Sequence, residues 1–515
     1  MKRFLVLPVL LVCVGALLVA GCSVPVQQSP AGHSQTQPSS SPETAGDALF
    51  AQGEDAYNSS NYYAAAEYFA LAKENYSAAG DAASFLRSRD MLFRSRGVIE
   101  NFPYNRSAME AVVAETFPDV PAAERAAWLD REKNGTLNSD GEVWYFDETL
   151  NNVLFHNTAM MREMNAQANH TPMYDELIPL ITAQWKDGTG PYGEPVSYKG
   201  VAELSIPRGD LPANGTLKLW VPVPIESGSQ TNVTIVSVEP ARYVKSSTGT
   251  GADLGLVYLE VPLEEVTGPF LNVSARFRFV QHEQRFRIDP AHVQPCDTSD
   301  PEYLKYTAPS GNIAITPGIQ AKAREIVGNE TNPYLMAEKV YWDVVSTHPY
   351  SHAPHIYLDF TGTPESVYVI STGIGDCASQ SAYYVALLRS LGIPARATGG
   401  YQMIEGHADT HFWTGFYLKG HGWIPADVTA AEGGEWAYNA TPGEVQRFKA
   451  YYFGSLDPFR YIIQNDMDIP VTPDLGDAAA PLSGWMQVPK LACDTCPDNP
   501  SVLGIMDSKV TITKE

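Results

Sequence analysis

The sequence predicts an α+β fold with three folded units, because its hydrophobic pattern changes twice along the chain. Helical periodicity dominates before about residue 195, alternation over residues 198–287 is typical of strands, and both signals occur after residue 300. At 515 residues the chain also exceeds what one hydrophobic core usually organises. We expect a helical region (46–195), a β-sandwich (196–290), a mixed core (300–470) and a C-terminal tail (471–515).

The first 22 residues have the features of an export signal, with Lys2 and Arg3 preceding an apolar run that ends at Ala20. The tetrapeptide Val-Ala-Gly-Cys that ends at Cys22 resembles a lipobox, which implies cleavage and lipidation of Cys22. The alternative is an uncleaved membrane anchor. Both place the rest of the chain outside the membrane, and the Ser-, Gln- and Pro-rich residues 23–45 are expected to form a flexible linker.

The composition excludes one class of function. Lys and Arg number 35 against 59 Asp and Glu, and the resulting charge of -24 argues against a nucleic-acid partner, which would require a basic face. An exported glycoprotein is compatible with the Asn-x-Ser/Thr triplets, which begin at Asn58, Asn75, Asn105, Asn134, Asn169, Asn214, Asn232, Asn272, Asn329 and Asn439.

Two kinds of periodicity precede the mixed core. Residues 47–96 resemble one tetratricopeptide repeat, which favours a helical cap or an arm that docks a protein partner over a solenoid. Further helices are expected over 108–117, 122–130 and 148–164, and a strand over 142–146, with no assigned chemistry. The segments 201–206, 216–221, 257–261 and 272–279 alternate as strands and predict the β-sandwich.

Cys377 is predicted to lie in the first turn of a helix. Asp376 provides an N-cap, an apolar stripe follows, and Gly392 with Pro394 ends the helix. Unpaired N–H groups and the helix dipole stabilise an anion at this position, so Cys377 is a candidate thiolate nucleophile. The alternative is an inert buried cysteine.

A predicted hairpin after this helix carries His411 and Asp427. A thiolate that attacks, an imidazole that carries the proton and a carboxylate that orients the imidazole are the groups that nucleophilic catalysis requires. A symmetric turn at Gly420 and His421 would pair His411 with Ala430 and place Asp427 opposite Thr414. Contact between His411 and Asp427 would then need a bulge or bend, for which Pro425 is a suitable place.

Several blocks in order resemble the transglutaminase-like superfamily over about residues 300–470. They are Gly375-Asp-Cys377, Leu388-Arg-Ser-Leu-Gly-Ile-Pro-Ala-Arg396, Gly400-Tyr401, His411-Phe-Trp413 and Gly422-Trp-Ile-Pro-Ala-Asp-Val-Thr429. The resemblance implies a papain-like core with Cys377 as nucleophile, His411 as acid/base and Asp427 as its orienting residue. Thr414-Gly415 departs from the family pattern, which usually has an apolar residue and an acid there.

Two further groups of histidines and cysteines contain residue types that can bind a metal. Prolines interrupt the spacing of His348, His352 and His355, which favours a loop near the mouth of the cleft over a zinc site. Cys493 and Cys496 fit a redox pair, half a zinc site or a disulfide, and with Cys296 they leave one cysteine unpaired. No cofactor or metal is expected.

We therefore expect a membrane-tethered cysteine enzyme that forms a thioester from a protein or peptide amide and passes the acyl group to an amine or to water. One alternative is a peptidase or amidase that acts on cell-envelope material. Another is an inactive cell-surface binding protein.

Overall fold

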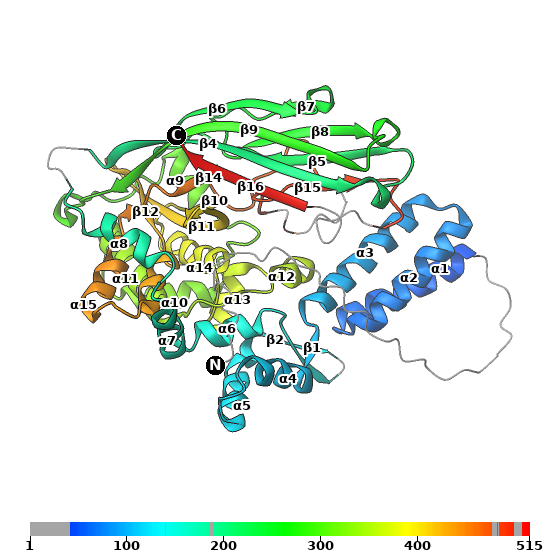
Figure 1. The fold of residues 1–515 in the computed structure, drawn as a ribbon, viewed down its shortest axis with the longest axis horizontal. Helices are drawn as coiled ribbons and strands as arrows, with labels where there is room; N and C mark the ends of the chain where they lie inside the picture. The colour runs from blue at the N-terminus through cyan, green and yellow to red at the C-terminus, as the bar shows by residue number, and fades with distance from the viewer. Residues whose placement is uncertain (1–41, 140, 186–189, 476–481, 483, 499–506) are drawn as a thin grey trace.

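The computed structural model describes residues 42–139, 141–185, 190–475, 482, 484–498 and 507–515. The predicted signal segment, the lipidation site Cys22 and most of the predicted linker lie outside these residues. Among the described helices, none is both long and apolar enough to cross a membrane. Figure 1 shows a layer of long strands above a mixed helix and sheet unit, with three N-terminal helices to one side.

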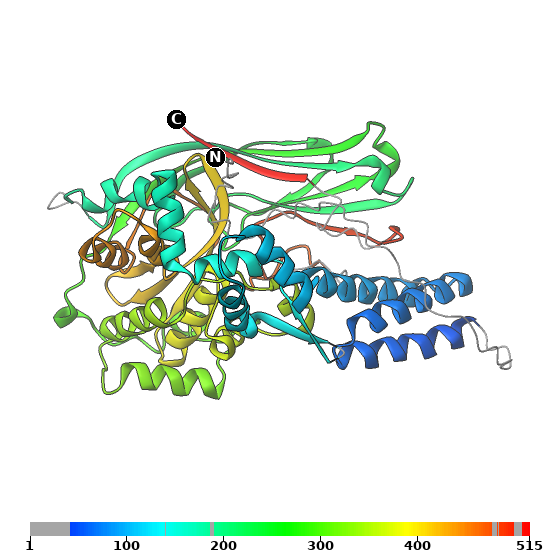
Figure 2. The ribbon, with the colours of Figure 1, turned by 60° about the horizontal axis from the view of Figure 1, so that its bottom comes forward.

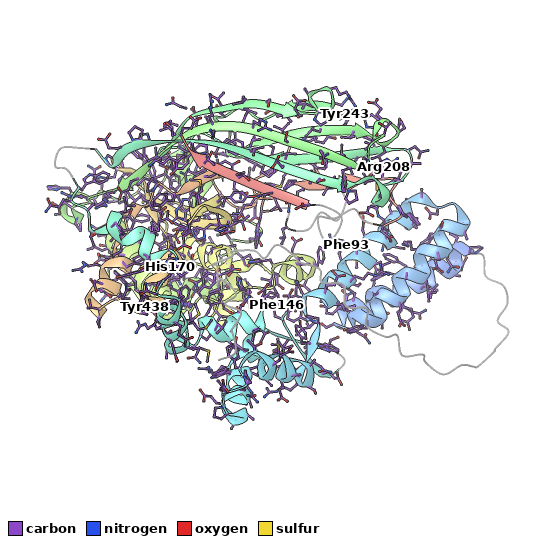
Figure 3. The ribbon with its side chains drawn as sticks, in the orientation of Figure 1. Phe93, Phe146, His170, Arg208, Tyr243 and Tyr438 are labelled. Atoms are coloured by element: carbon purple, nitrogen blue, oxygen red, sulfur yellow. A yellow bond between two sulfur atoms is a disulfide. The ribbon has the colours of Figure 1, made fainter. Side chains whose placement is uncertain are left out.

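The N-terminal helices are antiparallel neighbours that project from the rest of the molecule (Figure 2). Their bounds are α1 (Pro42–Asn58), α2 (Tyr62–Ala79) and α3 (Ala82–Asn101). The side chains of Asn61 and Asp81 cap α2 and α3. At Gly97 of α3 a Cβ atom would lie 2.6 Å from the ring of Phe360, so only glycine permits this approach. Phe93 of α3, labelled in Figure 3, has its ring centroid 5.4 Å from that of Phe360.

A second group of short elements connects these helices to the strands. It comprises β1 (Tyr104–Asn105), α4 (Arg106–Thr116), α5 (Ala122–Arg131), β2 (Thr136–Ser139), β3 (Glu142–Tyr145), α6 (Thr149–Phe155), α7 (Thr158–Ala168) and α8 (Tyr174–Thr182). The helix expected over 148–164 is divided, because the side chain of Asn157 accepts a hydrogen bond from the N–H of Met160 and starts a new helix.

Two antiparallel sheets form the upper layer of Figure 1. They contain β4 (Tyr192–Pro207), β5 (Thr216–Pro222), β6 (Gln230–Glu239), β7 (Val244–Ser247), β8 (Leu256–Pro262), β9 (Phe270–Arg285), β13 (Ser455–Leu456), β15 (Lys490–Cys493) and β16 (Asp507–Lys514). One sheet has the order β13-β9-β4-β16 with β6 also on β9, and the other has the order β15-β5-β8-β7. Apolar side chains from both sheets share one core. The segment expected as a C-terminal tail therefore adds a strand to each sheet.

The remaining elements form the unit that contains Cys377. The helices are α9 (Pro301–Tyr306), α10 (Pro317–Val327), α11 (Pro333–Thr347), α12 (His355–Thr361), α13 (Glu365–Thr372), α14 (Cys377–Ser390) and α15 (Pro442–Tyr451). The strands β10 (Ala395–Ile404), β11 (His407–Leu418), β12 (Gly422–Ala426) and β14 (Arg460–Gln464) form a sheet of order β12-β11-β10-β14. One face of this sheet packs on α14, and Tyr401, Tyr461 and Ile463 on the other face pack against the upper layer.

Candidate active site

Cys377 is the first residue of α14, as its sequence context predicts. One oxygen of Asp376 accepts hydrogen bonds from the N–H groups of Ala378, at 3.1 Å, and Ser379, at 3.2 Å. The hydroxyl of Ser379 in return accepts a hydrogen bond from the N–H of Asp376. This capping box places the Cys377 side chain at the positive end of the helix dipole. The same helix packs directly on β11, the strand that carries His411.

The hairpin β11–β12 brings His411 to Asp427, although its register differs from the prediction. Thr414 pairs with Ala426 and not with Asp427. The cause is the length of the loop: three residues separate Leu418 from Gly422, whereas the predicted symmetric turn has two. Extending this register places Asp427 opposite Trp413, which shares a face with His411. Diagonal neighbours are roughly 7–8 Å apart, within reach of these side chains. The Nε2 atom of His411 lies 2.9 Å from Oδ2 of Asp427.

Asp427 is completely buried and has additional donors. Its Oδ2 atom accepts a 2.7 Å hydrogen bond from Arg460, and its Oδ1 atom accepts one of 2.9 Å from the N–H of Ala430. Burial alone would raise the pKa of Asp427, but the neighbouring His411 and the Arg460 guanidinium hold it well below its usual range. Asp427 is therefore a carboxylate at any working pH.

The structure adds residues that sequence reasoning missed. Arg460 is fully buried and donates to both Asp427 and Asp457, and its guanidinium lies 5.1 Å from the ring centroid of Trp413. The side-chain amide of Gln487 donates to the carbonyl oxygens of Gly400 and His411, at 2.8 Å each. An arginine within a short apolar strand, three residues after an aspartate, was the available signal for Arg460. Nothing in the local sequence indicated Gln487.

Residues 320–428 match the family model of the transglutaminase-like superfamily, and Cys377, His411 and Asp427 all lie within them. This segment is a transglutaminase-like domain. No curated protein matches the chain. Among solved structures, a Cytophaga hutchinsonii protein provisionally named a cysteine protease is 15% identical with a TM-score of 0.39, over 63% of this chain and 92% of that one. The periplasmic domain of TgpA from Pseudomonas aeruginosa, bound to ethylmercury, is 14% identical with a TM-score of 0.22, over 53% of this chain and 96% of that one.

Side chains from outside the transglutaminase-like domain, together with Tyr350 from within it, pack over its cysteine. Cys377 is only 2% exposed and packs with Leu154, Phe155, Met161, Tyr350 and Trp436, which we call the aromatic cover. The ring centroid of Phe155 is 5.0 Å from that of Tyr350 and 5.3 Å from that of Trp436. The side-chain amide of Asn165 donates to the carbonyl of Trp436 and anchors α7 to this segment. The region to which no chemistry was assigned thus contributes Leu154, Phe155 and Met161 to the packing around Cys377.

The three histidines at positions 348, 352 and 355 lie between the end of α11 and the start of α12, and all three are buried. His348 packs on Tyr383. The backbone N–H of His352 donates to the side chain of Asn152, and the carbonyl of His352 accepts a hydrogen bond from the amide of that side chain. His355 lies between two carboxylates, Glu365 and Asp376. No group of histidine, cysteine and carboxylate side chains arranged to hold a metal occurs among the described residues.

Cys493 and Cys496 form a disulfide, which selects one of the three readings of this pair. Cys296 is half-buried and forms no disulfide within the described part of the chain. The guanidinium of Arg89, on α3, donates to the carbonyl oxygens of Cys493 and Cys496. The disulfide loop therefore docks on the N-terminal helices.

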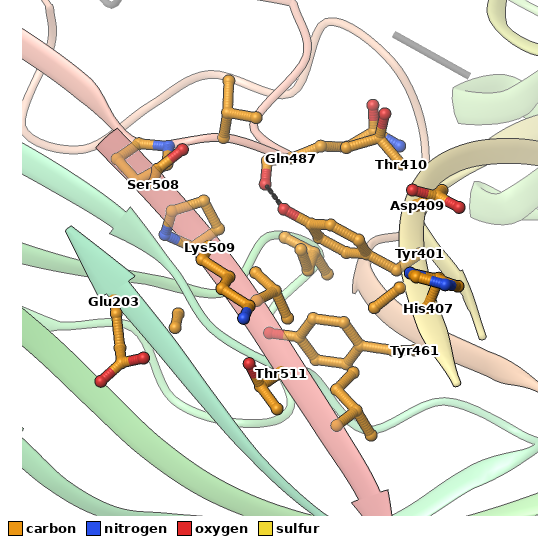
Figure 4. Close-up of a pocket in the computed structure, with 18 of the residues that line it drawn as sticks. Glu203, Tyr401, His407, Asp409, Thr410, Tyr461, Gln487, Ser508, Lys509 and Thr511 are labelled. Carbon is orange, nitrogen blue, oxygen red and sulfur yellow. Dashed lines mark hydrogen bonds between the residues drawn. The ribbon is translucent and has the colours of Figure 1, made fainter. Parts of the chain in front are cut away.

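A cavity of about 460 Å³ lies behind the sheet of the transglutaminase-like domain (Figure 4). Tyr401, Thr410 and Tyr461 line one side of it, and Val510 and Ile512 of β16 line the other. Thr410 precedes His411 on β11, so their side chains face opposite sides of the sheet. The cavity and the side chain of His411 therefore lie on opposite faces of this sheet.

Proposed function

We propose that the chain is an extracytoplasmic cysteine enzyme that forms a thioester from an amide of a protein or peptide. Cys377 is the nucleophile, His411 the general acid and base, and Asp427 the residue that orients His411. The observation that carries the proposal is the buried 2.9 Å contact between His411 and Asp427 in a domain whose nucleophile helix begins at Cys377.

The chemistry follows from these positions. The Cys377 thiolate attacks the amide carbon, and the C–S bond forms as the carbonyl becomes an oxyanion. The imidazolium of His411 then donates its proton to the departing nitrogen, the C–N bond breaks, and an amine leaves. Because Asp427 engages Nε2, the proton passes through Nδ1. An incoming amine or water next loses a proton to His411, attacks the thioester and releases the Cys377 thiolate.

The fate of the thioester depends on how well water is excluded. An amine acceptor must compete with water at about 55 M, which requires a desolvated cleft. The aromatic cover over Cys377 supports transfer to an amine. Hydrolysis of amides in cell-envelope material is the second candidate, and the predicted tether at Cys22 favours substrates near the membrane.

The location and the partner belong to the same proposal. The disulfide between Cys493 and Cys496 supports an oxidising compartment, in line with export and lipidation at Cys22. The tetratricopeptide-like helices α1–α3 are proposed to dock a protein partner, because α2 exposes 43% of Tyr63 and 47% of Leu71.

Alkylation of the purified chain with iodoacetamide at graded pH, followed by mass-spectrometric mapping, tests this function. Cys296 is the internal control, since burial raises the pKa of its thiol. We expect Cys377 to react well below about pH 8, faster than Cys296, and to lose this advantage in His411→Ala. Equal and slow labelling of Cys377 in the wild-type chain and in His411→Ala would contradict an activated thiolate. The inactive binding protein would then be the remaining hypothesis. Incubation with a glutamine-containing protein and an amine then separates amine transfer from hydrolysis by the mass of the product.

A further inference from the structure

Another buried histidine, His355, contacts the N-cap residue of the nucleophile helix. The Nδ1 atom of His355 is 3.0 Å from Oε1 of Glu365, and its Nε2 atom is 2.6 Å from Oδ2 of Asp376. His355, Glu365 and Asp376 are 8%, 1% and 2% exposed. The ring of Trp485 meets the imidazole edge-on, with centroids 4.1 Å apart. We call His355, Glu365 and Asp376 the cap network.

The two oxygens of Asp376 have different tasks in this network. Oδ1 accepts the N–H groups of Ala378 and Ser379 and caps α14. Oδ2 accepts from His355 and from the N–H of Ala353, at 3.2 Å. His355 therefore binds the oxygen of Asp376 that does not cap α14, while the other oxygen fixes the first turn of the helix. In the sequence, Cys377 lies between Asp376 and the two residues, Ala378 and Ser379, whose N–H groups bind the Asp376 carboxylate.

The geometry also defines the charge of His355. Each ring nitrogen faces a carboxylate oxygen, and an imidazole can donate from both nitrogens only when it is protonated. Burial would lower the pKa of His355, but Asp376 and Glu365 outweigh it and raise that pKa to about 10. Burial would likewise raise the pKa of Asp376, but His355 and the helix N–H groups lower it to about 2.

Few other charged groups face the network. His352 lowers the pKa of Asp376, and Asp359 raises the pKa of Glu365. The hydroxyl of Tyr368 lies near both carboxylates of the network. Burial raises the pKa of Tyr368 far above its usual value, so this hydroxyl stays neutral. The imidazolium of His355 is thus the main counterion of the Asp376 cap.

We propose that His355 is a positioning residue of this enzyme, which bridges Glu365 and Asp376 and keeps the cap of the nucleophile helix ionised and in place. The role rests on the proposed function of Cys377. When the cation is removed, Asp376 retains its burial and takes up a proton at higher pH. A protonated cap binds the two helix N–H groups less strongly, so Cys377 loses reactivity on the acid side of its pH profile.

The test is the rate of alkylation of Cys377 by iodoacetamide between about pH 4 and pH 9 in the full chain, His355→Asn and His355→Gln. The matched control is His170→Asn. His170 also bridges two carboxylates, Asp175 at 2.9 Å and Glu405 at 2.7 Å, but it is half-exposed and lies beyond α7 (Figure 3). We expect the acid-side midpoint to rise by about one pH unit or more in both His355 variants and to stay unchanged in His170→Asn.

The outcomes separate this role from the function on which it rests. A uniform loss of rate at every pH, with an unchanged midpoint, would reduce His355 to a packing residue and overturn the proposal. A wild-type Cys377 that reacts no faster than Cys296 would overturn the proposed function and the positioning role together. If the His355 variants do not fold, ¹⁵N-histidine NMR of His411→Ala decides: we expect one imidazolium to persist at about pH 8.5, and its absence would overturn the proposal.

Discussion

The Nε2 atom of His411 lies 2.9 Å from Oδ2 of Asp427, although the two residues are not cross-strand partners. The same oxygen accepts a hydrogen bond from Arg460 at 2.7 Å. The guanidinium therefore fixes the carboxylate independently of the imidazole. His411 can change its protonation state while its orienting group remains in position.

Replacement of Asp427 by Asn should lower kcat by about 10²–10⁴-fold, because the amide cannot stabilise an imidazolium and can select the wrong tautomer of His411. Measurement of thioester formation under single-turnover conditions checks this. Asp457→Asn is the matched control, since Asp457 is also a fully buried carboxylate that accepts a hydrogen bond from Arg460. An Asp427→Asn chain as active as Asp457→Asn would contradict the role of Asp427.

Replacement of Arg460 by Met should destabilise the fold by about 3–5 kcal/mol, because two buried carboxylates lose their counterion. Urea unfolding measures this effect. Arg87→Met removes an ion pair with Glu54 in which both side chains are largely exposed, and should cost about 1 kcal/mol or less. Similar losses in the two variants would show that Arg460 contributes little as a buried ion.

Replacement of Phe155 by Ala should open the aromatic cover and admit larger reagents to Cys377. We expect the rate with a bulky maleimide to rise severalfold relative to the rate with iodoacetamide. Phe93→Ala, which removes a ring packed on Phe360 of α12, serves as the control for general loosening. An unchanged ratio of the two rates in Phe155→Ala would mean that substrates reach Cys377 by another route.

Glu432 predicts a pH dependence of stability. Burial raises its pKa to about 8, while hydrogen bonds from the N–H of Tyr350 and from Gln380 oppose this shift. Because the folded state then holds a proton that the unfolded chain releases near its ordinary pKa, stability falls as pH rises from about 4.5 to about 8, by up to about 1.4 kcal/mol per pH unit. Glu432→Gln should flatten this slope in urea unfolding at several pH values, whereas Glu435→Gln should not.

Sequence reasoning located the residues of the candidate site better than it located their surroundings. The cap at Asp376 and the order of Cys377, His411 and Asp427 were local signals. The register was wrong by one residue because loop length decides it, and Gly420 and Gly422, both with positive φ, allow a three-residue loop. The divided helix at Asn157 was missed for a similar reason, since a single side-chain cap overrides a continuous apolar pattern.

Contacts between distant segments account for the rest. Arg460, Gln487 and Phe155 reach the site from elements that show no catalytic signal of their own. The strands β15 and β16 pair with β5 and β4, far away in sequence, and alternation alone does not name a partner. The buried positions of His348, His352 and His355 likewise depend on helices that pack around their loop.

The aromatic cover has a consequence for anyone who would graft this chemistry onto another scaffold. A transplant limited to residues 320–428 would carry Cys377, His411 and Asp427 but neither Phe155, Trp436 nor the guanidinium of Arg460. Such a graft would contain the three proposed catalytic residues without the side chains that pack over Cys377 and without the guanidinium that binds Asp427. The residues that a graft must include are therefore defined by their contacts in space and not by the boundaries of the matched sequence segment.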